Sequence, residues 1–242
     1  LEQSHIITGR QHVGSIETQT YYFAPFSLPA NALVMALKVT NHASSTQEVS
    51  VFAKPNLKLG EGRPYPSDWN ESLESRGQPT PHMRETGAGG GHAFYIPFDS
   101  ATQMTCGEDS PLYHGVLNDT SISQNNTCSG SSQVPLLHQS LLLAPGETKT
   151  WGLTIIFLND NPTHPRAQSF RDSRSADDVM SLWGSYSGGQ TAMSALQNEL
   201  SEFEAWRQPA PSGLSTTELK VWRQSEAVLR MGLIEEKPSN TG

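Results

Sequence analysis

The sequence is poor in charged residues, which make up only 17% of its 242 positions. Basic residues are the scarcer kind: 16 Lys and Arg stand against 24 Asp and Glu, so the formal net charge is -8. Nucleic acids and anionic membranes are bound through concentrated basic surface, and we therefore expect neither as a partner. A neutral polar partner such as a carbohydrate is compatible with this charge balance.

Long hydrophobic runs are missing too. No window of about 18 apolar residues occurs, so we expect no transmembrane helix. The chain begins at Leu1, without a methionine and without the charged-then-apolar leader of a signal peptide. We interpret it as a mature chain that has lost a signal peptide, or as a trimmed piece of a longer protein. The expected location is exported: secreted, periplasmic or lumenal.

Cysteine is rare, with Cys106 and Cys128 as the two examples in the chain. Both lie in polar, turn-rich sequence, whereas an isolated structural thiol is usually buried among apolar neighbours. The pair is therefore predicted to form a disulfide that closes a loop, which implies an oxidising compartment. Sequons for N-glycosylation begin at Asn70, Asn118 and Asn125, and they matter only if the source is eukaryotic.

Recognisable catalytic motifs are also lacking. The glycine run at 87–91 has no Lys-Ser/Thr of a phosphate-binding loop, and in Gly-Ser-Tyr-Ser-Gly at 184–188 the nucleophile position holds Tyr186. The eight histidines show neither helical ligand spacing nor a compact Cys/His set. We therefore assign no catalytic residue and no metal ligand, and we expect no cofactor.

Strand signals run from the start of the chain to about residue 165. Residues 33–40 alternate between two faces, a turn of small polar residues follows, and 48–53 is predicted to be a partner strand in a hairpin. A second hairpin is predicted from 136–143 and 149–158 around an Ala-Pro-Gly-Glu turn.

The last of these strands has two apolar faces. Trp151, Leu153, Ile155 and Phe157 alternate onto one side, and Ile156 makes the far end apolar on the other side as well. Strands at this spacing, with turns rich in glycine and proline, predict a mainly β fold built on a large antiparallel β-sandwich. The stretches 55–92 and 99–133 lack apolar periodicity and are interpreted as long loops.

The pattern becomes helical near residue 175. Ser175 to Asp178 has the spacing of a capping box and predicts a short helix that ends near Trp183. A second amphipathic stretch follows, with Glu199 among the charged residues placed opposite its apolar face. After a Pro/Gly linker, Ser215 to Glu218 starts a last helix, whose apolar stripe is expected to pack into another domain. The stripe consists of Val221, Trp222, Val228, Leu229 and Leu233.

Four residues are candidates for contact with a substrate. Tyr65 and Trp69 lie in a polar loop, where exposed rings would stack on sugar faces; the alternative is that they hold the loop onto the sandwich. Glu235 and Glu236 follow the last helix, where a solvated helix end is the alternative interpretation. No other position suggests a substrate-binding role.

The last helix also carries a family resemblance. The stretch Glu-Leu-Lys-Val-Trp-Arg-Gln-Ser-Glu-Ala-Val-Leu-Arg-Met at 218–231, followed by Ile-Glu-Glu at 234–236, resembles the opening helix of the catalytic barrel in bacterial glucoamylase-type enzymes (glycoside hydrolase family 15). The layout upstream is similar too, because those enzymes begin with a large β-sandwich (a super-sandwich). The resemblance implies a β-sandwich at 1–170, a helical linker at 171–213, and the first helix of an (α/α)6 barrel at 214–242.

The resemblance further implies that the intact protein hydrolyses α-glucosidic bonds of oligo- or polysaccharides with inversion, through two carboxylates on the barrel. No position here corresponds to either carboxylate, so the chain is expected to be the non-catalytic front part. Its expected partners are the downstream barrel segment, or a second chain of the same protein, and the carbohydrate substrate.

Two other functions fit the sequence. The chain would be a free-standing exported sandwich that binds a glycan or a protein, or it would be the N-terminal chain of another autoprocessed hydrolase. The residues encoded after Gly242 discriminate between them. Helical repeats with paired carboxylates favour the glycoside hydrolase, a stop codon favours the binding module, and Ser, Thr or Cys favours autoprocessing.

Overall fold

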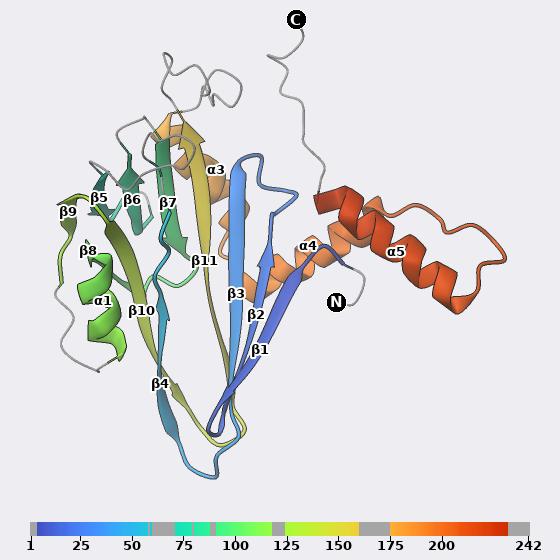
Figure 1. The fold of residues 1–242 in the computed structure, drawn as a ribbon, viewed down its shortest axis with the longest axis horizontal. Helices are drawn as coiled ribbons and strands as arrows, with labels where there is room; N and C mark the ends of the chain where they lie inside the picture. Colours follow the sequence, from blue (N-terminus) through green and yellow to red (C-terminus); the bar gives the residue numbers. More distant parts are fainter. Residues whose placement is uncertain are drawn as a thin grey trace, which may run out of the picture.

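The structure is a computed structural model that describes residues 4–57, 59, 71–78, 80–87, 91–117, 124–159 and 175–231. These residues form one large and one small antiparallel sheet that pack face to face, with helices on the outside (Figure 1). The predicted mainly β sandwich is therefore confirmed. None of the helices in the described part of the chain is long and apolar enough to cross a membrane.

The larger sheet has eight strands in the order β1-β2-β3-β11-β7-β6-β5-β9, and each neighbouring pair is antiparallel. In chain order its strands are β1 (Ile7–Val13), β2 (Ile16–Phe23), β3 (Asn31–Asn41), β5 (Glu71–Arg76), β6 (His82–Thr86), β7 (Gly91–Pro97), β9 (Thr127–Gly130) and β11 (Thr148–Asn159). The long strand β11 lies between β3 and β7, well inside the sheet.

The smaller sheet has three strands in the order β4-β10-β8. They are β4 (Gln47–Ala53), β10 (Gln133–Leu143) and β8 (Gln103–Glu108). The core between the two sheets combines Leu137, Leu141 and Leu143 of β10 with Trp151 and Leu153 of β11. The predicted inward face of β11 is thus confirmed, and the Trp151 indole N–H donates a hydrogen bond of 3.0 Å to Thr102 Oγ1.

The two predicted hairpins are wrong, although their strands exist. β3 pairs with β2 and β11, whereas β4, which follows it, pairs with β10 in the other sheet. Likewise β10 and β11 are joined by a short turn but belong to different sheets. Alternating apolar residues show that one face of a strand is buried, and a strand buried across a sandwich has the same pattern as one paired within a hairpin.

Two turns lead from one sheet to the other, between β3 and β4 and between β10 and β11, and Asn41 connects them. Its side-chain amide donates to the backbone carbonyls of Ser45 (2.9 Å), Leu143 (3.1 Å) and Ala144 (3.2 Å). Its backbone carbonyl accepts from the Gly146 N–H at 2.8 Å. Because this amide is fully buried and has several partners, it holds the two turns together at one end of the sandwich.

Helices α3 (Ala176–Ser187) and α4 (Ala192–Trp206) cover the outer face of the larger sheet. Val179, Met180 and Trp183 of α3 pack on Ile156 and its neighbours, which explains why the end of β11 is apolar on both faces. The capping box predicted at the start of α3 is confirmed. The helix runs past the predicted end because it stops only where Gly188 adopts the left-handed conformation (φ 41°).

The stretches interpreted as loops contain regular structure. Strands β5 and β6 fall within 55–92, and a helix, α1 (Asp109–Leu117), falls within 99–133. Helix α1 lies on the outside of the smaller sheet, where its Leu112 packs on Val134 and Leu136. These elements were missed because they are short and much of their surface is polar, so that apolar periodicity does not develop.

The predicted disulfide is confirmed. Cys106 in β8 is bonded to Cys128 in β9, with a Cα–Cα distance of 6.0 Å. Because β8 belongs to the smaller sheet and β9 to the larger one, the bond joins the two sheets as well as closing a loop. Asn125 lies beside it, and its side-chain amide donates to the Cys106 carbonyl at 3.3 Å.

We predict that the double variant Cys106→Ala/Cys128→Ala unfolds more easily by about 3 kcal/mol, the chain-entropy value for a loop of this length. Urea unfolding followed by tryptophan fluorescence measures the change. Reduction of the unchanged protein by dithiothreitol in denaturant should produce the same loss. Two reactive thiols in the oxidised, denatured protein would contradict the disulfide itself.

We predict a second loss of stability for Gly152→Ala. A Cβ on Gly152 of β11 would overlap the Cβ of Ala192 in α4 and the Met35 carbonyl, so the free energy of unfolding should fall by about 1–3 kcal/mol. The matched control is Gly184→Ala in the interior of α3, where nothing lies within 4 Å of the added carbon. That control should gain up to about 1 kcal/mol. Equal effects of the two substitutions would contradict the close approach of α4 to β11.

Candidate functional site

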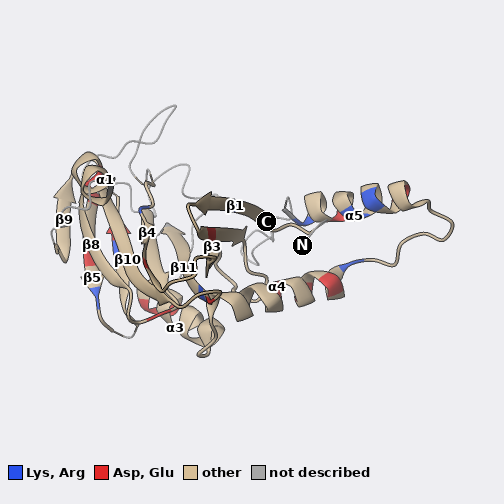
Figure 2. Cartoon of the chain, turned by 90° about the horizontal axis from the view of Figure 1, so that it is seen from below, with Lys and Arg blue, Asp and Glu red and all other residues tan. Residues whose placement is uncertain are grey.

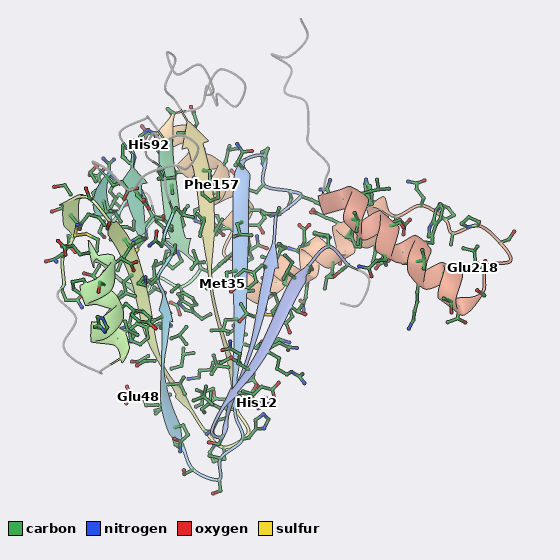
Figure 3. All side chains as sticks on the ribbon, viewed as in Figure 1. His12, Met35, Glu48, His92, Phe157 and Glu218 are labelled. Atoms are coloured by element: carbon green, nitrogen blue, oxygen red, sulfur yellow. A yellow bond between two sulfur atoms is a disulfide. The ribbon has the colours of Figure 1, made fainter. Side chains whose placement is uncertain are left out.

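A helical hairpin extends from one side of the sandwich. Its first arm, α4, lies against the larger sheet near its start, and its second arm is α5 (Thr216–Met231). Figure 2 shows the two helices running alongside each other beyond the edge of the strands. Figure 3 places Glu218, at the start of α5, far from His12 and Glu48 at the end of the sandwich where the sheets cross over.

A buried carboxylate at Glu199 holds α4 to the beginning of the chain. Glu199 Oε1 lies 2.7 Å from His5 Nε2, and Oε2 accepts a 2.8 Å hydrogen bond from the Phe26 N–H. The His5 ring also stacks on Phe26 and meets the edge of Phe203. The prediction that Glu199 lies on the exposed face of the helix is wrong, because its partners come from distant segments that the helical pattern cannot show.

A second buried carboxylate, Glu226, fixes α5 against the end of α4. Its Oε2 lies 2.8 Å from Arg223 Nη1 and 3.7 Å from Arg207 Nε, while Oε1 accepts from the Gln208 N–H at 3.1 Å. The carboxylate is only 8% exposed, so its charge is compensated by arginine and backbone N–H groups rather than by water. This role could not be predicted from the sequence, where Glu226 has the pattern of any polar residue of an amphipathic helix.

The inner face of α5 completes this contact. Ala227 is fully buried, and the Arg230 guanidinium lies over the ring of Phe26 and within 5.9 Å of the Trp206 ring centroid. Trp222 is half-buried, and its indole nitrogen is shielded from solvent with no hydrogen-bond partner among the described residues. The inner face of α5 is therefore already occupied by α4 and the loop that carries Phe26.

The outer face of α5 carries aliphatic side chains that no described residue covers. We define it by Val221, Val228 and Leu229, whose exposed fractions are 61%, 54% and 67%. These residues are spaced seven and eight apart, which places them on one side of the helix. The single apolar stripe predicted from the sequence is thus divided between two faces, and Leu233 lies outside the described residues. Clustered exposed aliphatic side chains are typical of a surface that another chain segment covers.

The remaining sequence candidates are not tested by the structure. Tyr65, Trp69, Glu235 and Glu236 lie outside the described residues, as do the sequon residues Asn70 and Asn118. Among the described residues, no group of three or more His, Cys, Asp or Glu side chains is arranged to hold a metal ion.

Two glutamates are buried within the sandwich rather than in a cleft. Glu71 of β5 is 1% exposed and Glu85 of β6 is 0% exposed. The Tyr95 hydroxyl donates to Glu85, and burial, together with the charge of Glu85, raises the pKa of Tyr95 well above its usual value. Both carboxylates lie on the inside of the sheet, on the side of Leu73 and Met83, which belong to the core.

No protein-family model matches the sequence, and no curated protein matches it. Among solved structures, a bacterial glucoamylase in complex with acarbose aligns with 95% of this chain at a TM-score of 0.50 and 7% identity. A protein named as a kojibiose phosphorylase, from the human microbiome, aligns with 91% at a TM-score of 0.38 and 10% identity. The chain spans 31% of the first structure and 22% of the second, and at these identities the likeness to glucoamylase concerns the fold alone.

We predict that Glu226→Gln loosens α5 without unfolding the sandwich. Breaking a buried ion pair costs about 3 kcal/mol, which corresponds to roughly hundred-fold faster amide exchange in 216–231. Amide exchange in β11 should not change. Hydrogen exchange read by mass spectrometry measures both segments.

The matched control for this prediction is Glu204→Gln. Glu204 also contacts Arg207, but its side chain is 61% exposed, and an exposed pair contributes little stability. Exchange in α5 should therefore be unchanged in the control. Equal exchange in the two variants would show that Glu226 does not hold the helix in place.

Proposed function

We propose that this chain is the non-catalytic front part of a carbohydrate-active hydrolase that acts on α-glucosidic bonds of oligo- or polysaccharides. In this proposal residues 1–170 form the sandwich domain, 171–213 a helical linker, and 214–242 the first helix and loop of an (α/α)6 barrel. The partner is the downstream barrel segment, carried on the same polypeptide or on a second chain of the same protein.

The observation that carries the proposal is the uncovered outer face of α5. A 16-residue helix is marginally stable by itself in water, and in the described part of the chain α5 is held through its inner face. Packing the outer face against further helices would remove Val221, Val228 and Leu229 from water. The likeness of fold to a bacterial glucoamylase, of which this chain spans less than a third, supports a helical domain as the occupant.

The chemistry in this proposal belongs to the barrel. Inverting hydrolysis needs an acid and a base whose carboxyl groups are about 6.5–9.5 Å apart, with an open position for water between them. Glu71 and Glu85, at 1% and 0% exposure, are not assigned to this role. We place Tyr65, Trp69, Glu235 and Glu236 near the substrate entrance, where loops of the sandwich and the end of α5 would face the barrel.

The proposed location of the protein is exported. The disulfide between Cys106 and Cys128 supports this location, because such bonds persist in oxidising compartments. The acidic balance of the chain supports a neutral polar substrate over nucleic acid or an anionic membrane.

We predict that the 242-residue chain alone releases no glucose from maltotriose. The polypeptide that continues through the segment encoded after Gly242 should release glucose whose first-formed anomer is β, as inversion of an α-bond requires. Proton NMR of the early products distinguishes the anomers. Turnover by the 242-residue chain, or a stop codon after Gly242, would overturn the proposal.

We also predict that Val228→Glu weakens the attachment of the downstream segment. If the segments are expressed as two chains, the charge buried in the interface should reduce co-purification at least ten-fold. The matched control is Val13→Glu, the same substitution at a valine of β1 on the sandwich that is 73% exposed, against 54% for Val228. A loss of co-purification in both variants, or in neither, would contradict docking at the outer face of α5.

A further inference from the structure

A polar cleft lies on the sandwich, away from the helical hairpin. It has a volume of about 450 Å³ and opens between the end of β10 and the start of β11. This volume falls within the range of roughly 300–1,000 Å³ that is typical of small-molecule sites. Its lining consists of Asp99, Gln139, Ser140, Leu141, Leu142, Thr148, Lys149 and Thr150.

The cleft follows from the crossing of the two sheets. β10 and β11 leave the turn at 144–147 together, but β10 joins β4 and β8 while β11 joins β3 and β7. β8 pairs with β10 only as far as His138, so on that side the edge of β10 beyond His138 meets no strand in the described part of the chain. The two arms therefore separate and leave a gap lined by side chains and by an open strand edge. Figure 3 labels Glu48, the register partner of Leu142, at this end of the sandwich.

The polar groups of the cleft are held in place before any ligand binds. Gln139 Nε2 donates to Asp99 Oδ2 at 2.7 Å, and Gln139 Oε1 accepts from the Thr102 hydroxyl at 2.9 Å. The same hydroxyl accepts from the buried Trp151 indole, which connects the cleft to the core. Asp99 also accepts from the Ala101 N–H through Oδ1. Groups fixed in this way lose little conformational entropy when they bind a ligand.

The charges of the cleft favour an uncharged ligand. One carboxylate, Asp99, and one ammonium group, Lys149, line it, and Lys149 Nζ has a long contact of 3.8 Å with Glu147. Carboxylate and amide oxygens accept from hydroxyl groups, and the ammonium group donates to them. A neutral polyhydroxylated ligand matches all of these groups.

We propose that this cleft is an accessory site that binds a short neutral oligosaccharide. The choice of a glucose oligomer as ligand rests on the proposed function, whereas the cleft itself does not. Gln139 and Asp99 orient adjacent hydroxyl groups of one sugar ring, and Lys149 donates to a third oxygen. The site retains the end of a longer glucan near the protein.

The test is a titration of the 242-residue chain with maltotriose, followed by amide shifts in two-dimensional NMR. Shift changes should concentrate at Gln139, Ser140, Leu142, Lys149 and Thr150. A dissociation constant in the millimolar range, about 1–10 mM, is expected for a small open site. No shift changes up to about 50 mM, or changes that map to another surface, would overturn the proposal.

Two substitutions and a matched control test the contacts. Lys149→Ala should weaken binding at least three-fold, and Gln139→Leu, which removes both amide hydrogen bonds at similar size, at least ten-fold. Lys220→Ala removes the same charge from an exposed position on α5 and should leave the affinity unchanged. Thermal unfolding of each variant confirms that the fold is intact. Equal affinities in all three variants would contradict the assigned contacts.

The outcomes separate this inference from the proposed function. If maltotriose does not bind the cleft but the extended polypeptide hydrolyses it, the accessory site is wrong and the proposed function stands. If maltotriose binds the cleft and the extended polypeptide has no activity, the proposed function is wrong and the site belongs to a binding module. Binding of an uncharged extended peptide with equal affinity would contradict the assignment of a sugar as ligand.

Discussion

The burial of β11 on both faces is the constraint from which the rest of the structure follows. Trp151 and Leu153 on one face are buried against the smaller sheet. Ile156 and Leu158 on the other face are buried against helix α3. Strands of the same sheet cannot bury the first face, so β10, which precedes β11 across a short turn, belongs to a second sheet. The helices on the second face include α4, which lies so close to β11 that only glycine fits at position 152.

The placement of the helical hairpin depends on buried carboxylates rather than on apolar packing alone. Glu199 binds the start of the chain and the loop at Phe26 to α4, and Glu226 binds the end of α4 to α5. Each is buried with charged or backbone partners, which makes its geometry demanding and its loss costly. These contacts fix the orientation of α5, and as a consequence Val228 and Leu229 face away from the sandwich.

The protein thereby presents two surfaces of opposite character. The outer face of α5 is aliphatic, lies on the projecting hairpin, and would gain stability from burial by a further segment of chain. The cleft between β10 and β11 is polar, prearranged by hydrogen bonds, and open to a small hydrophilic ligand. In the hydrolase that we propose, the first surface would anchor the catalytic domain and the second would retain the substrate.

The sequence was sufficient to predict strands where the apolar period is long, as in β3, β10 and β11, and it also predicted the capping box at Ser175 and the disulfide between Cys106 and Cys128. It placed the apolar stripe on α5 but not its division into two faces. Strand pairing, the burial of particular glutamates and the position of the cleft became known from the three-dimensional fold. The physical reason is that periodicity records how much of each face is shielded from water, whereas the identity of the shielding group depends on residues far along the chain.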